Sequence, residues 1–169
     1  MRFVTVVLSI VMLGSTSGAS ARVTPTQSRR KAPTFVLSDA NGSPVRLSDY
    51  KGKVVVLDFW ATWCTGCKVE IPWFMEFQDK YKSQGLATIG VAMDDEGWQK
   101  VRPYVGEHPF NYPIVAGDAA TLATRFSVVG LPMTLLIDRD GRIAESHAGM
   151  IDKNGWEQEV REVLKERPR

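Results

Sequence analysis

The sequence predicts an α/β domain, built on a mixed sheet with helices on both faces. Lys53 to Trp60 is a near-continuous apolar run, which is typical of a strand buried on both sides. From about Gly66 to Ser83, apolar residues recur at helical spacing and predict a helix. Leu86 to Met93 is a second buried strand. Strand, helix and strand together form the centre of the predicted fold.

The remaining elements extend this unit on both sides. A hairpin is expected around Asp39-Ala40-Asn41-Gly42, because apolar segments flank these turn residues. Further on we expect helices near 98–105, 121–126 and 156–164, and two strands at 133–137 and 142–147 joined by a tight turn. The whole is a single α/β sheet with an N-terminal β-hairpin extension and a central inserted α/β element.

Length and charge narrow the class of protein. The 169 residues suit one domain, which we place at 32–169. The net charge of +2, without a basic stripe interleaved with aromatics, argues against nucleic acid as a partner. Residues 22–31, which carry Thr, Ser, Pro and Arg, are interpreted as a flexible, solvated linker.

The first 21 residues have the features of a signal peptide. Arg2 is followed by an apolar run from Phe3 to Gly14, and Ala19-Ser20-Ala21 is a small-residue cleavage site. The segment predicts a periplasmic or secreted protein. An uncleaved membrane anchor is the alternative, although the run is shorter than the roughly 20 apolar residues of a spanning helix.

The two cysteines, Cys64 and Cys67, are the candidate catalytic residues. A bridge between positions so close together constrains the unfolded chain little, so the pair indicates redox chemistry rather than structural cross-linking. Cys64 falls where the buried strand gives way to the helix, and the helix N-terminus favours its thiolate. Cys67 lies one turn later, where it can resolve a mixed disulfide.

Other uses of a C-x-x-C pair find little support. A zinc site needs two more ligands, and His108 and His147 are isolated from each other. Covalent haem needs a histidine directly after the second cysteine, where Lys68 stands. We therefore expect neither metal nor cofactor, with a thiol-based copper or zinc carrier kept as an alternative.

Two acidic residues accompany the cysteines. Asp58 lies inside the apolar strand, and Glu70 lies one helical turn after Cys67. Burial raises the pKa of a carboxyl and suits it to proton transfer, which Cys67 needs. The alternatives are a structural acid for Asp58 and a solvated helix face for Glu70. Asp94, with its two acidic neighbours, is interpreted as part of the first turn of the next helix.

The segment from Val56 to Cys67 resembles the thioredoxin active-site motif, and the surrounding pattern is similar to the TlpA/ResA branch of exported bacterial thioredoxin-like proteins. The motifs that carry this resemblance are Ala32-Pro33-x-Phe35, Leu47-Ser48-Asp49-Tyr50-Lys51-Gly52-Lys53, Glu70-x-Pro72 and Gly130-Leu131-Pro132-x-Thr134.

The resemblance implies a thioredoxin fold with a cis peptide before Pro132, close to the sulfurs. It implies that the backbone of Leu131 pairs with an extended substrate segment, and we expect Trp63 to flank the site. It matches Glu70 to an acid near the cysteines and Asp58 to the buried acid of thioredoxin. One departure is Gly66, which stands where many relatives have proline.

The function expected is dithiol–disulfide exchange without an organic cofactor. The resemblance implies a reductase of protein disulfides, with apocytochrome c as a typical client and a membrane electron donor of the DsbD type. We expect a monomer, because the sequence shows no extra dimerisation segment. An oxidase or isomerase of the same fold is one alternative. A peroxiredoxin-like peroxidase is another, although Ala61 occupies the position where that chemistry needs threonine.

Overall fold

A computed structural model describes residues 23–168, so the predicted signal peptide at 1–21 lies outside the described residues. Within them, seven strands form one sheet in the order β2-β1-β5-β4-β3-β6-β7. The strands are β1 (Val36–Ser38), β2 (Pro44–Arg46), β3 (Val54–Trp60), β4 (Leu86–Ala92), β5 (Ile114–Ala116), β6 (Met133–Ile137) and β7 (Ile143–Ala148). The α-helices are α1 (Thr65–Tyr81), α2 (Trp98–Glu107), α3 (Ala119–Phe126) and α4 (Lys153–Lys165). None of the described helices is both long and apolar enough to cross a bilayer.

The centre of the sheet is the predicted strand–helix–strand unit. β3 and β4 are parallel and buried along their whole length. β6 runs antiparallel to β3, and β7 antiparallel to β6. The N-terminal hairpin β1–β2 joins the other edge by antiparallel pairing with β5, which itself is parallel to β4. The α/β fold with a hairpin extension is confirmed; β5, with only three residues, was not predicted from the sequence.

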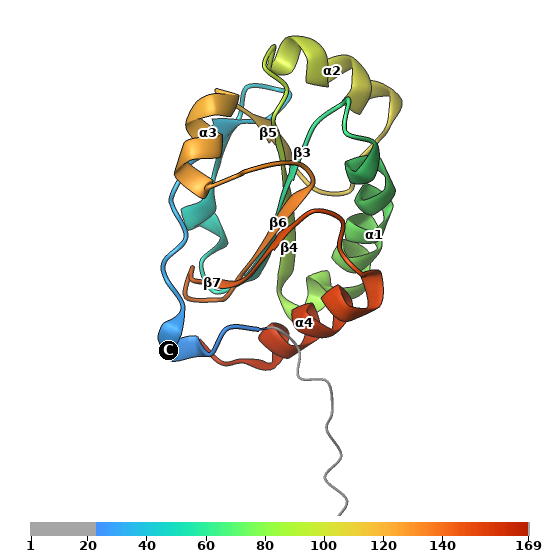
Figure 1. The fold of residues 1–169 in the computed structure, drawn as a ribbon. Coiled ribbons are helices and arrows are strands. Elements are labelled where there is room, and N and C mark those ends of the chain that lie inside the picture. The colour runs from blue at the N-terminus through green and yellow to red at the C-terminus, as the bar shows by residue number, and fades with distance from the viewer. Residues whose placement is uncertain (1–22, 169) are drawn as a thin grey trace, which may run out of the picture.

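Helices cover both faces of the sheet. Figure 1 shows α1 and α4 on one side and α3 on the other. Phe74 and Phe77 of α1 are buried on the first face, and Trp156 of α4 packs into the same core. On the second face Phe126 of α3 lies 5.2 Å from Phe59, measured between ring centroids. The two layers fix β3 in place, and with it the start of α1.

The segment 23–31 is ordered, which corrects the flexible linker expected at 22–31. Arg29 is only 4% exposed, and its guanidinium donates to Asp138 at 3.0 Å and to Glu166 at 2.6 and 2.7 Å. The backbone of this segment also pairs with the start of β7, where Ile143 N–H donates to Arg30. Composition alone could not show this, because the two carboxylate partners are 109 and 137 positions away along the chain.

Candidate active site

The cysteine pair sits in the turn between β3 and α1. Cys64 is the N-cap residue of α1 and Cys67 lies in its first turn. The two form a disulfide with their Cα atoms 5.3 Å apart. The backbone N–H of Cys67 donates to the sulfur of Cys64 at 3.2 Å. Cys64 Sγ thus takes the place of the oxygen that usually caps a helix N-terminus.

This position defines the roles of the two sulfurs. After reduction, the unpaired N–H groups at the start of α1 favour the thiolate of Cys64, and the thiolate is the nucleophile in disulfide exchange. Cys64 is 5% exposed and Cys67 1%, so Cys64 is the more accessible of the pair. The arrangement supports attack by Cys64 and resolution by Cys67.

A buried carboxylate holds the loop that leads into Cys64. Asp94 follows β4 and accepts hydrogen bonds from the backbone N–H of Thr62 at 3.0 Å and from its hydroxyl at 2.5 Å. Both residues are buried. Asp94 therefore fixes the approach to the cysteines and is not the acid in the first turn of the next helix that the sequence predicted, since α2 begins at Trp98. Its neighbours along the chain gave no sign of this role, because Thr62 lies 32 positions away.

Pro132 lies beside the cysteine turn, at the head of β6. The Leu131–Pro132 peptide is cis, as the resemblance implied. A Cβ atom placed on Gly66 would lie 3.3 Å from Cδ of Pro132 and 3.2 Å from Cγ of Met150. The side chains of Pro132 and Met150, from distant segments of the chain, therefore pack closely over Gly66. The substrate-binding roles of Leu131 and Pro132 stay predictions, but their placement next to the cysteines agrees with them.

Exposed apolar side chains occur in this turn and in two segments that adjoin it. Trp63 is 66% exposed and directly precedes Cys64. Val129, 87% exposed, comes just before the Gly130-Leu131-Pro132 segment, and Met150 is half exposed over Gly66. Large apolar side chains that gather on a surface indicate an interaction site. We call these three residues the apolar rim.

Glu70 is fully buried behind the cysteines, on the inner side of α1. Its Oε1 accepts a hydrogen bond from the backbone N–H of Ile151 at 2.6 Å. Burial raises the pKa of this carboxyl to about 7, although the hydrogen bond from Ile151 works in the opposite direction. A group with this pKa exchanges protons readily near neutral pH. The solvated helix face considered for Glu70 is thereby excluded.

Asp58 is the second buried acid, on β3 beneath α1. It is 1% exposed. Burial raises its pKa well above the ordinary range, and the neighbouring charge of Glu70 raises it further. The charge of Glu70 acts on Asp58, so the ionisations of the two carboxyls are coupled. Proton transfer by either acid stays a prediction.

The two histidines occupy separate places. His108 stacks on Tyr104 at the end of α2, whereas His147 on β7 contacts the carbonyl of Met150 and the ring of Trp156. In the part of the chain that the structure describes, no three His, Cys, Asp or Glu side chains form a metal-binding group.

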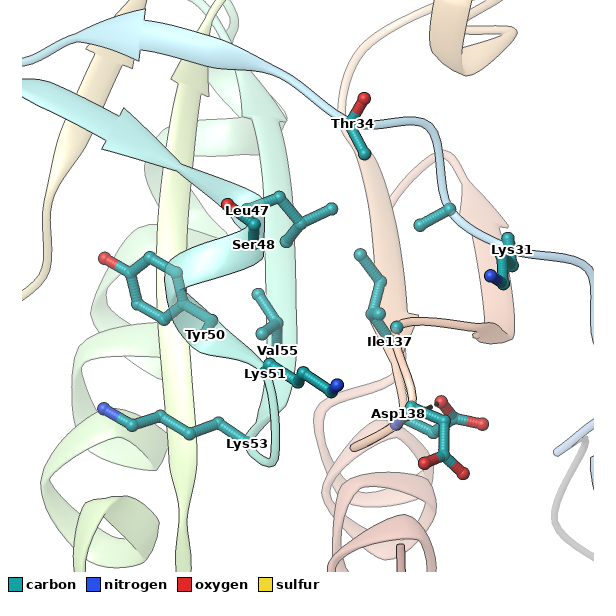
Figure 2. A pocket seen from close by; sticks show the side chains of 13 residues that line it. Lys31, Thr34, Leu47, Ser48, Tyr50, Lys51, Lys53, Val55, Ile137 and Asp138 are labelled. Carbon is teal, nitrogen blue, oxygen red and sulfur yellow. Dashed lines mark hydrogen bonds between the residues drawn. The ribbon is translucent and has the colours of Figure 1, made fainter. Parts of the chain in front are cut away.

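A hollow of about 210 Å³ lies at the opposite end of the sheet (Figure 2). Its apolar floor includes Leu47, Val55 and Ile137, and Lys31 and Lys51 stand at its rim. Val55 belongs to the first half of β3, whereas Cys64 follows the end of that strand. This hollow therefore lies away from the cysteines.

Comparison with known proteins agrees with this geometry. The AhpC/TSA family matches residues 29–146. The thiol–disulfide oxidoreductase ResA of Bacillus thuringiensis is 31% identical over 134 residues, which cover 79% of this chain and 77% of that protein. ResA of Geobacillus thermodenitrificans is 33% identical over 165 residues, covering 96% and 94%.

The chain is a ResA-like thiol–disulfide oxidoreductase of the AhpC/TSA family. Among solved structures, a thiol:disulfide interchange protein DsbE of Chlorobium tepidum is similar, with a TM-score of 0.76 and 33% identity. The match covers 80% of this chain and 96% of that structure. In this ResA-like chain the buried residue Ala61 stands where peroxidase chemistry needs threonine, while both exchange cysteines are present.

Proposed function

We propose that this protein is a periplasmic or secreted, monomeric reductase of protein disulfides. The apolar rim supports a polypeptide client, because Trp63 and Met150 offer exposed apolar contacts beside the cysteines and Val129 adds another in the segment that leads to Pro132. The resemblance to the TlpA/ResA branch adds a client class, the oxidised cysteine pair of apocytochrome c, and a membrane electron donor of the DsbD type.

The observation that carries the reducing direction is the buried acid pair. Stabilising the reduced thiolate raises the potential of a C-x-x-C pair and makes it an oxidant. Glu70, whose pKa is about 7, is partly ionised near neutral pH, and its negative charge opposes that thiolate and lowers the potential. Thr65 and Gly66 stand between the cysteines, so no histidine adds the positive charge of strongly oxidising pairs. The balance favours a reductant.

The reaction proceeds in two exchanges. The thiolate of Cys64 attacks one sulfur of the client disulfide, and the other client sulfur leaves as a thiolate that takes up a proton. Cys67 then gives its proton to the Asp58–Glu70 pair and attacks Cys64 Sγ. The client leaves with two thiols, and the protein holds the Cys64–Cys67 disulfide seen here. A dithiol donor must return two electrons for the next cycle.

The N-terminal segment supports export of this activity. Its charged start, short apolar run and Ala19-Ser20-Ala21 site are features of a signal peptide, and the predicted cleavage leaves a chain from Arg22. In an oxidising compartment a reductase works only while a donor keeps it reduced, which is why a membrane donor belongs to the proposal.

The equilibrium potential tests the direction. The protein is equilibrated with glutathione mixtures, and Trp60 and Trp63 report the fraction oxidised by fluorescence. We expect a value between roughly −270 and −180 mV, between thioredoxin and the disulfide isomerases. A value near −120 mV would make the protein an oxidase. A peptide carrying an oxidised Cys-x-x-Cys-His pair then tests the client class, and purified peptide thiols are counted after reaction.

A further inference from the structure

Unpartnered buried polar atoms gather on one face of the sheet. Among residues 23–168, the buried side-chain atoms that lack a hydrogen-bond partner are both carboxylate oxygens of Asp58, Oε2 of Glu70, the hydroxyls of Thr88, Tyr112 and Thr134, and the indole N–H groups of Trp60 and Trp156. Native proteins leave only a few such groups unpaired, because each costs about 1–3 kcal/mol. A cluster of them around one carboxylate therefore calls for a functional explanation.

The strand register brings the cluster together around Asp58. Asp58 pairs with Thr134 on β6 and with Gly90 on β4, so these three residues form one row across the sheet. Trp60 lies two residues further along β3, on the same face as Asp58.

Gly90 allows two aromatic side chains to approach this row. A Cβ atom on Gly90 would lie 3.1 Å from Nε1 of Trp60 and 3.3 Å from Cε2 of Tyr112. The same atom would lie 2.5 Å from Ile114 Cδ1, so no larger residue fits there without rearrangement. The missing side chain thus lets the Trp60 indole N–H and the Tyr112 ring lie against β4, in the strand position next to Asp58.

The chemistry of the cluster is complementary. An ionised Asp58 only accepts hydrogen bonds, whereas indole N–H and phenol O–H groups donate them. Asp58 and Tyr112 also interact electrostatically. Burial raises the pKa of the Tyr112 phenol, and the charge of Asp58 raises it further. Buried water typically makes about three hydrogen bonds to otherwise unpaired polar groups of this kind.

We propose that Tyr112 is a positioning residue for Asp58: its hydroxyl donates to the Asp58 carboxylate through internal water shared with the Trp60 indole N–H. This contact holds Asp58 in the orientation and charge state in which it can take the proton of Cys67. The inference rests on the proposed role of Asp58 in exchange, and on no client or direction of electron flow.

Other groups around Asp58 can also change its pKa, and the test must separate their effects from that of Tyr112. Glu70 faces it from α1 and raises its pKa by like charge. Thr134 on β6 and Thr88 on β4 contribute neutral hydroxyls, and Gly90, the β4 residue directly opposite Asp58, contributes no side chain. Tyr104 of α2 acts on Tyr112 and is therefore one step further away.

Tyr112→Phe is the decisive variant, because it removes the hydroxyl and keeps the ring. The readout is the pKa of Asp58 in the reduced protein, followed by carbon NMR of the labelled carboxyl. We expect an upward shift of about one pH unit, a tenfold change in the ionisation constant. The pH profile of Cys67 alkylation should move upward with it. Tyr104→Phe is the matched control, in which the Asp58 pKa stays where it is.

A second comparison separates positioning from packing. In an Asp58→Asn background, Tyr112→Phe should leave the Cys67 pH profile unchanged. An unchanged Asp58 pKa in Tyr112→Phe, or an equal shift of the Cys67 profile in the Asp58→Asn background, overturns the proposal. If Tyr112→Phe does not fold, the phenol carbon of Tyr112 is followed in the unmutated protein. It should report the titration of Asp58 and be flat in Asp58→Asn, and a flat signal in both refutes the contact. None of these readouts depends on a client, so an oxidising potential would leave them intact.

Discussion

Replacing Glu70 by glutamine should change how the stability of the oxidised protein depends on pH. The pKa of Glu70 rises from an ordinary 4.5 to about 7 in the folded state. Between these values the folded protein holds a proton that the unfolded chain has lost, so stability falls as pH rises. The loss is about 1.4 kcal/mol per pH unit. Between pH 4.5 and 7 the destabilisation amounts to about 3 kcal/mol. The protein bears the full destabilisation above pH 7 and none of it below pH 4.5.

Glu70→Gln removes this titration and keeps an oxygen for the N–H of Ile151. The variant should match the unmutated protein near pH 4.5 and be more stable at pH 8, by up to about 3 kcal/mol. Burial raises the pKa of Asp58 in both proteins, and the loss of the Glu70 charge lowers it in the variant, which acts in the same direction as the expected gain at high pH. Urea unfolding of the oxidised proteins, followed by tryptophan fluorescence from pH 4.5 to 8.5, measures the difference.

Glu76→Gln serves as the control, because Glu76 lies on the same helix, is exposed and pairs with Lys153 at 2.6 Å. An exposed ion pair is worth at most about 1 kcal/mol, so this variant should show no comparable gain at high pH. A stability difference between Glu70→Gln and the unmutated protein that is the same at pH 5 and pH 8 would refute the assignment of a raised pKa to Glu70.

Three further predictions concern other parts of the molecule. In the reduced protein at neutral pH, iodoacetamide should label Cys64 before Cys67, and Cys67→Ser should accumulate a mixed disulfide on Cys64; peptide mass mapping that finds the label mainly on Cys67 contradicts this. Arg29→Met should lower the free energy of unfolding by about 3–5 kcal/mol because it leaves Asp138 buried without its cation, whereas exposed Arg30→Met should stay within about 0.5 kcal/mol. Gly66→Ala should be more favourable in a Met150→Ala background by about 0.5–1 kcal/mol, since the new Cβ would otherwise meet Met150 at 3.2 Å; additive effects within about 0.3 kcal/mol in a double-mutant cycle would exclude the contact.

The parts of the site that are local in the chain could be predicted from the sequence. Cys64 and Cys67 lie within one helical turn, and the strand before them is apolar on both faces, so their geometry follows from neighbouring residues. The burial of Asp58 follows from the same run. The start of α1 was expected at Gly66 and is found at Thr65.

Long-range contacts account for what was missed. From the sequence alone Asp94 is interpreted as an acid at the start of the next helix. The structure shows that its position after β4 places it against Thr62. The sequence around Tyr112 does not indicate that it lies near Asp58, because that position depends on Gly90 of another strand. The three residues of β5 are too few to show a period, and pairing with β4 on one side and β1 on the other makes them a strand. Each of these depends on packing between segments that the sequence leaves far apart.

The Arg29 ion pairs bear on where the protein can be attached to another body without covering its cysteines. They bring Arg29 of the N-terminal segment against Glu166 near the C-terminal end of the described chain, so both segments lie at one pole of the domain. Asp138, at the far end of β6 from Pro132, marks the same pole. The cysteines open at the other pole, after the last residue of β3. A support, a label or a fused domain attached at either of these ends therefore leaves the dithiol facing outward.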